Sequence, residues 1–160
     1  MSPSKKALIG AALQGLGFAL STGVRGSPPI LSRGPATVHR LAAAILVVVA
    51  VLALALVVAA IGTLGRQWSI RARTVTHHRL ITRGPYSVIR HPIYVAMGLF
   101  MCVLGLALVP PWAAASACVP YAIGTIFRTR AEDQLMAATF GTEFEIYRRE
   151  VPGLIPRLWR

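Results

Sequence analysis

Acidic residues are scarce in this chain of 160 residues. Only five Asp and Glu stand against 17 Lys and Arg, and charged residues make up 14% of the sequence. Soluble domains average roughly a quarter charged residues, so this shortfall argues against a domain surrounded by water on all sides. The net charge of +12 would suit nucleic acid, but the basic residues form clusters between apolar runs rather than one polar face. We therefore expect no nucleic-acid partner.

Cysteine is also rare, with two residues in the chain. Cys102 and Cys118 both lie inside apolar segments and form no CxxC pair, so we expect two small, buried, apolar side chains. The four histidines show no metal-ligand spacing with each other or with cysteine, so we expect no metal site. These histidines are His39, His77, His78 and His91.

Apolar residues, in contrast, form long runs. The run 41–64 contains no charged residue, and as a helix of about 36 Å it could cross a hydrocarbon core of about 30 Å. The run 7–24 is interrupted by glycines and follows Lys5 and Lys6, as in a signal peptide. We favour a retained span here, because no small-x-small cleavage pattern follows it and its glycines suit close helix packing.

Two shorter apolar runs, 93–109 and 112–127, are separated only by Pro110-Pro111. Proline cannot continue a helix in place, so this uncharged linker predicts a tight helical hairpin. The predicted fold is all-α: a polytopic membrane bundle of about four transmembrane helices, forming one domain over residues 1–160. The segments 66–92 and 128–160 connect and follow these spans.

The basic residues predict the orientation of this bundle. With four spans, the N-terminus, the segment 66–92 and the C-terminal tail share one side, which carries fourteen basic residues against three on the other. The positive-inside rule makes the first side cytoplasmic. We therefore expect an integral membrane protein, of the bacterial inner-membrane type, with both termini cytoplasmic. The glycine-rich first span also offers a packing face for a homodimer.

The first candidate site lies at the start of the third span. Arg90, His91 and Tyr94 surround Pro92, which suits the first turn of a helix. Unpaired backbone N–H groups at such a place favour an anion, and a neighbouring arginine strengthens that preference. An interfacial anchor of Tyr and Arg at the level of the lipid headgroups is an equally good interpretation of these residues alone.

The second candidate site lies in the C-terminal segment, which contains all five acidic residues. The pattern predicts one helix over 128–139, a stop at Gly141, and a second short helix through Tyr147 that starts with a Thr142/Glu145 capping box. Arg128 and Glu132 are one helical turn apart beside the end of a span. Such a pair is compatible with function or with a simple surface salt bridge.

Together these segments resemble the isoprenylcysteine carboxyl methyltransferase family over about 77–156. The matching motifs are His78-x-Leu80-Ile81-Thr82-x-Gly84-x-Tyr86, Arg90-His91-Pro92-x-Tyr94, Arg128-x-x-x-Glu132-Asp133, and Phe140-Gly141 through Tyr147 to Val151-Pro152. Two positions depart from the family pattern: Asp133 replaces the second glutamate of a Glu-Glu pair, and Phe144 replaces a tyrosine.

The resemblance implies an integral-membrane methyltransferase that uses S-adenosylmethionine (SAM), with the cofactor held by the segments 66–92 and 128–160. By position, Arg128 and Arg90 would act on the acceptor as the catalytic residues. The residues implied to hold the cofactor are His78, Arg79, Leu80, Ile81, Tyr86, His91, Tyr94 and Glu132.

The implied acceptor is a lipophilic small molecule or lipid, and a carboxylate of an isoprenoid or prenylcysteine-like compound fits best. A carboxylate is ionised at neutral pH and needs no general base, whereas an amine or a thiol must lose a proton. His91 and Tyr94 are the only nearby candidates for such a base. Methylation of a phospholipid amine or a thiol stays an alternative, as do an NADPH-dependent membrane reductase and a non-enzymatic, lipid-binding scaffold.

Overall fold

The computed structural model describes residues 2–24, 35–65 and 79–156. Within these ranges all regular elements are helices, so the predicted helical class is confirmed for the described part of the chain. The elements are α1 (Pro3–Gly23), α2 (Ala36–Leu64), the 3-10 helix η3 (Gly84–Ser87), α3 (Pro92–Leu108), α4 (Pro111–Phe140) and α5 (Thr142–Glu150).

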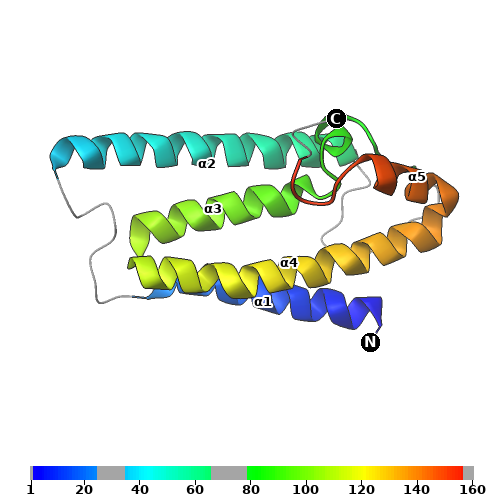
Figure 1. Cartoon of the computed structure of the whole chain (residues 1–160), viewed down its shortest axis with the longest axis horizontal. Coiled ribbons are helices and arrows are strands. Elements are labelled where there is room, and N and C mark those ends of the chain that lie inside the picture. The colour runs from blue at the N-terminus through cyan, green and yellow to red at the C-terminus, as the bar shows by residue number, and fades with distance from the viewer. Residues whose placement is uncertain (1, 25–34, 66–78, 157–160) are drawn as a thin grey trace.

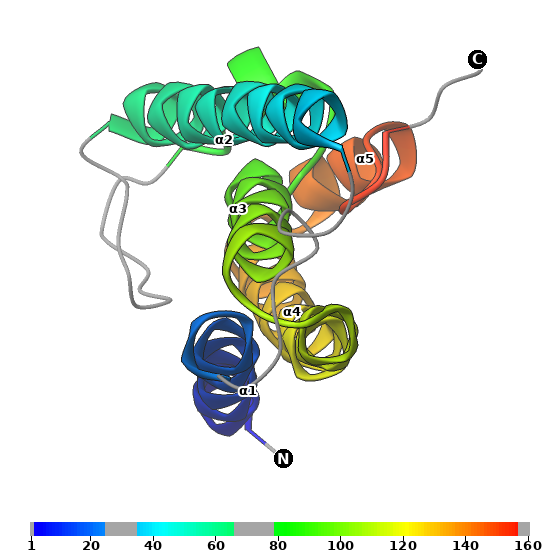
Figure 2. The same cartoon turned by 90° about the vertical axis from the view of Figure 1, so that its left-hand side faces the viewer.

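The four long helices lie side by side (Figure 1). Helix α3 lies between α2 on one side and the close pair of α1 and α4 on the other, and α2 crosses α3 obliquely (Figure 2). The start of α1, the end of α2, the start of α3 and the end of α4 gather at one end of the molecule, together with α5 (Figure 1). The two candidate segments of the sequence therefore meet at this end.

Helix α4 corrects one predicted boundary. The sequence pattern predicts a span over 112–127 and a separate helix from Arg128, but the structure has one continuous helix from Pro111 to Phe140. Pro120 lies inside it without ending it. No glycine or polar turn signal separates Phe127 from Arg128, so nothing in the local sequence stops the helix there. Helix α4 thus carries Arg128 and Glu132 beyond its apolar part.

Helix α2 is, among the described residues, the helix that is both long and apolar enough to cross a membrane, while α3 is apolar but shorter. Most of α2 is exposed rather than buried against the other helices, and leucine and valine side chains dominate its exposed surface. Only Ala53 and Ala60 of α2 are buried. A helix this apolar gains nothing from facing water, so its exposed surface suits lipid.

The glycines of α1 allow it to pack closely on α4. A side chain at Gly10 would place its Cβ 2.7 Å from the backbone oxygen of Gly124, and one at Gly17 would place it 2.9 Å from that of Ala117. Between these glycines, the buried Gln14 amide donates to the Thr125 hydroxyl at 3.0 Å. Close packing is thus confirmed for Gly10 and Gly17, whereas nothing lies within 4 Å of a Cβ at Gly15. A homodimer stays a prediction, and it would need a surface other than this one.

Glycine also sets the two sharp turns around the site. Gly84 starts η3 with φ +61°, and Gly141 ends α4 with φ +53°, a region of backbone conformation that favours glycine. The stop at Gly141 is therefore confirmed. The predicted Thr142/Glu145 capping box is wrong, because Gly141 occupies the N-cap of α5, which has no side-chain cap. Since Thr142 is already helical, its hydroxyl is misplaced for capping.

The two cysteines are exposed, which corrects the expectation that they are buried. Cys102 lies on α3 and Cys118 on α4. Their position inside apolar segments of the sequence led to that expectation. In a helix pair whose outer surface is apolar, an apolar neighbourhood is equally compatible with exposure.

Candidate active site

The site begins at the junction between the segment before α3 and the C-terminal residues. Arg90 N–H donates to Pro152 O at 2.9 Å, and His91 N–H donates to Gly153 O at 3.0 Å. His91 is the N-cap of α3 and is 8% exposed. Two backbone hydrogen bonds therefore join segments that are about sixty residues apart in the sequence, and they fix the direction in which Arg90 and His91 project.

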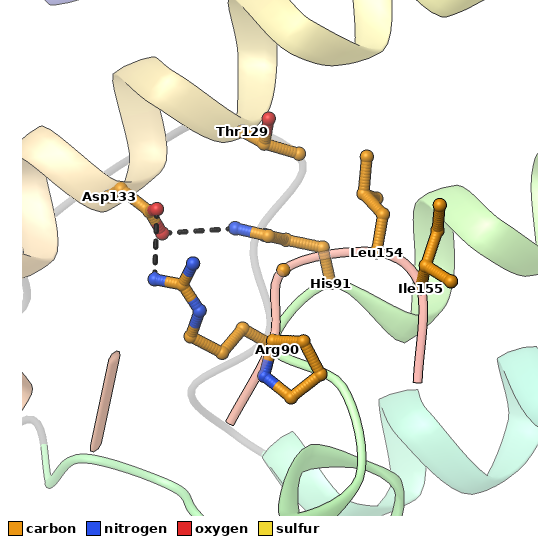
Figure 3. A pocket seen from close by; sticks show the side chains of 8 residues that line it. Arg90, His91, Thr129, Asp133, Leu154 and Ile155 are labelled. Atoms are coloured by element: carbon orange, nitrogen blue, oxygen red, sulfur yellow. Dashed lines mark hydrogen bonds and ion pairs between the residues drawn. The ribbon is translucent and has the colours of Figure 1, made fainter. Parts of the chain in front are cut away.

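Asp133 of α4 connects these two side chains. One carboxylate oxygen accepts from Arg90 Nη1 at 2.9 Å, and the other lies 3.0 Å from His91 Nε2 (Figure 3). On the opposite edge of the ring, His91 Nδ1 lies 3.4 Å from a carboxylate oxygen of Glu132. The imidazole is thus held between two carboxylates, and each ring nitrogen has an acceptor.

The charges in this arrangement reinforce one another. Burial alone would lower the pKa of His91, but the hydrogen bonds and charges of Asp133 and Glu132 outweigh it and raise that pKa. Burial alone would raise the pKa of Asp133, but the hydrogen bond from His91 and the charges of His91 and Arg90 lower it. Both shifts favour an imidazolium beside a carboxylate.

Tyr94 links the second arginine to Glu132. Arg128 Nε donates to the Tyr94 hydroxyl at 2.8 Å, and this hydroxyl donates to Glu132 Oε1. The guanidinium carbon of Arg128 lies 5.3 Å from the centre of the Tyr94 ring, within cation–π range. Arg128 and Glu132 are themselves 3.9 Å apart, with side chains 20% and 29% exposed. They are therefore a largely covered pair, not a simple surface salt bridge.

A pocket of about 350 Å³ opens on the Asp133 side of this cluster. Asp133 and Thr129 come from one side of α4, while Leu154 and Ile155 of the C-terminal segment add apolar surface (Figure 3). The buried Nε of Arg90 has no hydrogen-bond partner within the described ranges. A buried guanidinium nitrogen without an acceptor is costly, so the pocket favours a ligand with an acceptor oxygen.

Helix α5 supports the pocket from the side. The Tyr147 hydroxyl donates to the backbone oxygen of Tyr86 at 2.6 Å, and Tyr147 packs with Phe144, Val151 and Leu80. Burial raises the pKa of Tyr147 to about 12, so its hydroxyl stays a donor at neutral pH. Phe144, which stands where the family has a tyrosine, is 2% exposed and lies under the guanidinium of Arg90.

The structure therefore brings together five of the predicted site residues: Arg90, His91, Tyr94, Arg128 and Glu132. Leu80 and Tyr86 lie beside them through α5, and burial followed by the negative charge of Glu132 raises the pKa of Tyr86. Ile81 is half-buried and Arg79 is exposed, while His78 falls outside the described residues.

Sequence reasoning did not assign roles to Asp133 or to the segment Pro152–Ile155. Asp133 appeared only as a conservative replacement in a motif, although an acid next to Glu132 could be expected to reach the same region. Val151-Pro152 was part of the resemblance, but nothing local indicates that the backbone there pairs with residue 90. That contact depends on how the helices are arranged in space.

The apolar, lipid-suited helix α2 on one side of the bundle and the polar cluster at one end of it indicate a membrane protein with a polar site. The sequence model of the isoprenylcysteine carboxyl methyltransferase (ICMT) family matches residues 44–138. This range is more than half of the chain and includes Arg90, His91, Tyr94, Arg128 and Glu132. The chain belongs to this family, whose members are methyltransferases.

Similar curated proteins carry two kinds of name. The chain is 34% identical to the cobalt-zinc-cadmium resistance protein CzcN of Cupriavidus metallidurans and 36% identical to the nickel-cobalt-cadmium resistance protein NccN of Alcaligenes xylosoxydans xylosoxydans. It is 30% identical to the protein-S-isoprenylcysteine O-methyltransferase B of Arabidopsis thaliana.

Each of these matches extends over 101 residues, which is 60% or 61% of this chain. The matches cover 45% of the two bacterial relatives and 50% of the plant relative. The match with this chain therefore spans about half the length of the curated relatives.

Proposed function

We propose that this protein transfers a methyl group from SAM to the carboxylate of a lipophilic membrane acceptor, such as an isoprenoid or a prenylcysteine-like compound. The observation that carries the proposal is the position of His91 between Glu132 and Asp133. Both ring nitrogens of His91 already face carboxylate oxygens, and the raised pKa favours its imidazolium form, so His91 is poorly placed to take a proton from an acceptor.

The state of His91 bears on the class of acceptor. The other nearby candidate base, Tyr94, already donates its hydroxyl proton to Glu132. An amine or a thiol would need a base to remove its proton, whereas a carboxylate is ionised without help. The geometry therefore favours O-methylation over the alternatives of phospholipid-amine or thiol methylation.

The two arginines are proposed to act on the acceptor. The cluster contains the two guanidiniums of Arg90 and Arg128 beside the carboxylates of Glu132 and Asp133, and the raised pKa of His91 favours a further positive charge there. Such surroundings suit an anionic acceptor, and a guanidinium orients a carboxylate through paired N–H donors. Arg90 lines the pocket, and its buried Nε has no hydrogen-bond partner among the described residues. Arg128 is held in place by Tyr94.

The remaining predicted residues are proposed to hold the cofactor: His78, Arg79, Leu80, Ile81, Tyr86, His91, Tyr94 and Glu132. When bound, SAM supplies the methyl group on a cationic sulfur. A pocket of about 350 Å³ lies in the size range of small-molecule sites, and of these residues His91 lines it. The pocket-lining residues Asp133, Gly153 and Leu154 join the proposed set. The chain's main contributions would be alignment and exclusion of water.

We propose that α1, α2, α3 and the first part of α4 all span the membrane, with both termini cytoplasmic, in a bacterial inner membrane. The positive-inside distribution and the gathering of the site segments at one end of the molecule support this orientation. A lipophilic acceptor would then reach the site from the bilayer, with its carboxylate at the membrane surface.

The names of the two bacterial relatives concern metal resistance. Within the described ranges there is no group of three or more His, Cys, Asp or Glu that could hold a metal ion. The side chains of Asp133 and Glu132 instead form ion pairs and hydrogen bonds with His91, and Asp133 also pairs with Arg90. We therefore do not extend binding of cobalt, zinc, cadmium or nickel to this site, and a methylated product that acts elsewhere is compatible with those names.

Calorimetry tests the cofactor. The full chain, purified in detergent, is titrated separately with S-adenosylhomocysteine and with NADPH. We expect binding of S-adenosylhomocysteine and no binding of NADPH. Binding of NADPH alone would replace this proposal by the reductase, and binding of neither would favour the non-enzymatic scaffold.

A further inference from the structure

The two cysteines lie on neighbouring antiparallel helices and are the only cysteines in the sequence. Cys102 belongs to α3 and Cys118 to α4, which Pro110 joins in a tight hairpin (Figure 1). Both side chains are free thiols and exposed. The proposed methyl transfer uses neither of them.

The register of the hairpin places these cysteines opposite each other. A Cβ at Gly105 would lie 3.2 Å from the Cβ of Ala114, and a Cβ at Gly98 would lie 3.0 Å from Cε1 of Tyr121. Cys102 lies between the two glycines, and Cys118 lies between Ala114 and Tyr121, at spacings of three and four residues.

Residues three and four apart share one face of a helix. The cysteines therefore occupy the layer between these two contacts, where their thiols are near enough to interact and the Cys118 thiol donates to the backbone oxygen of Ala114 at 3.5 Å.

The surroundings of the pair are apolar. Leu99 and Leu106, one turn on either side of Cys102, are 42% and 37% exposed, and Val119 beside Cys118 is 60% exposed. A site surrounded by these apolar side chains strongly disfavours a net charge. With no third His, Cys, Asp or Glu among the described residues to complete a group, a four-coordinate ion such as Zn²⁺ lacks ligands here.

We propose that Cys102 and Cys118 form a two-thiolate site for a soft, thiophilic ion or group that carries two positive charges, such as Hg²⁺ or a monosubstituted arsenic(III). Two thiolates and two positive charges make a neutral adduct, which is compatible with the apolar side chains around the cysteines. Soft ions prefer sulfur ligands, and two sulfurs on facing helices provide both. The site is independent of the proposed methyl transfer, so neither proposal depends on the other.

The reaction with phenylarsine oxide, a lipophilic probe of this class, balances without an oxidant. Each thiol gives up its proton and forms one As–S bond. The As=O bond breaks, and its oxygen leaves with the two protons as water. Arsenic stays in the +3 state, and the product bridges α3 and α4 within one chain.

Intact-mass spectrometry of the full chain in detergent tests the site. After one equivalent of phenylarsine oxide and a wash with the monothiol mercaptoethanol, we expect one phenylarsenic group retained per wild-type chain. The dithiol dithiothreitol should remove it. Cys102→Ser and Cys118→Ser should each abolish retention, because a single As–S bond exchanges readily with a monothiol.

A protection assay on the wild-type chain does not depend on the folding of the variants. Without the arsenical, N-ethylmaleimide should label both cysteines; after the arsenical, it should label neither, and dithiothreitol should restore both. The proposal would be overturned if the wild type did not retain the adduct. It would also be overturned if either single-cysteine variant retained it, or if the arsenical bridged two chains.

Discussion

His91 and Tyr94 are one turn apart on α3, and both are fully engaged by acidic or cationic partners. His91 lies between Asp133 and Glu132, while the Tyr94 hydroxyl accepts from Arg128 and donates to Glu132. The sequence motif places these residues near each other, and the resemblance adds Arg128 and Glu132. Which side chain touches which could not be predicted, because the contacts join residues 34 to 42 positions apart.

Tyr94→Phe tests the role of that hydroxyl. The variant keeps the ring beside Arg128 but leaves Arg128 Nε and Glu132 Oε1 without their common partner. A lost hydrogen bond to a charged group costs about 1 to 3 kcal/mol, so we expect kcat/KM for methyl transfer to fall by about fivefold to a hundredfold. The measurement is steady-state kinetics in detergent, with the thermal unfolding midpoint as the check on folding. A folded variant with unchanged kcat/KM would show that the hydroxyl does not position the arginine.

The charges around His91 predict a pH dependence of stability. Because folding raises the pKa of His91, its contribution is complete below about pH 6.5 and is lost as the pH rises through the raised value. Folding lowers the pKa of Asp133, so its contribution is present above about pH 4 and is lost as the pH falls through the lowered value.

Thermal unfolding followed by tryptophan fluorescence measures both effects. His91→Gln should lower the midpoint most in acid and least in alkali, and Asp133→Asn should do the reverse. Glu143→Gln, a change at an exposed acid of α5, is the control and should have little effect at any pH. Equal losses at all pH values for both site variants would mean that packing, rather than ionisation, explains them.

At the level of elements, α1 and α4 form the closest contact in the molecule. The sequence predicted that the glycines of α1 pack closely, and it predicted the α3–α4 hairpin from two prolines. It did not predict that α4 continues past Phe127, since the change from apolar to polar composition resembles a helix end. It also could not reveal that Gly10 lies against Arg128, because helix pairing is a tertiary property.

Gly10→Ala and Gly15→Ala form a matched pair on α1. A Cβ at Gly10 would lie 2.6 Å from Arg128 Cγ and 2.7 Å from Gly124 O, whereas nothing lies within 4 Å of one at Gly15. We expect Gly10→Ala to destabilise the protein by about 1 to 3 kcal/mol, because the helices must separate. Gly15→Ala should be neutral or stabilising by up to about 1 kcal/mol through helix propensity. The thermal unfolding midpoint separates the two, and an equal effect of both would contradict the α1–α4 contact.

At the level of the whole molecule, charge and apolar runs predicted more than any local pattern did. The long runs without charged residues predicted the helical class and the apolar helix 41–64. They also predicted that the two site segments gather at one end. What composition could not provide is the separation of α2 from the α1–α4 pair by α3, which depends on the shapes of the facing surfaces.

Reporter fusions test the proposed orientation. With both termini cytoplasmic, a green fluorescent protein fused after Arg160 should fluoresce in a bacterial host, and alkaline phosphatase at the same position should be inactive. A phosphatase fused within Pro110-Pro111 should be active, because that turn lies at the opposite end of the bundle (Figure 1). The reversed pattern would contradict the orientation derived from the positive-inside rule.

The class of acceptor is the central claim, and the stability of the methylated product in alkali tests it most directly. Purified protein is incubated with a membrane lipid extract and SAM labelled in its methyl group, and the labelled lipid is then treated with base. A methyl ester hydrolyses and releases labelled methanol, so we expect volatile label that depends on Arg128. Label that stays in the lipid after alkali would indicate an N-methyl or S-methyl product and would contradict a carboxylate acceptor.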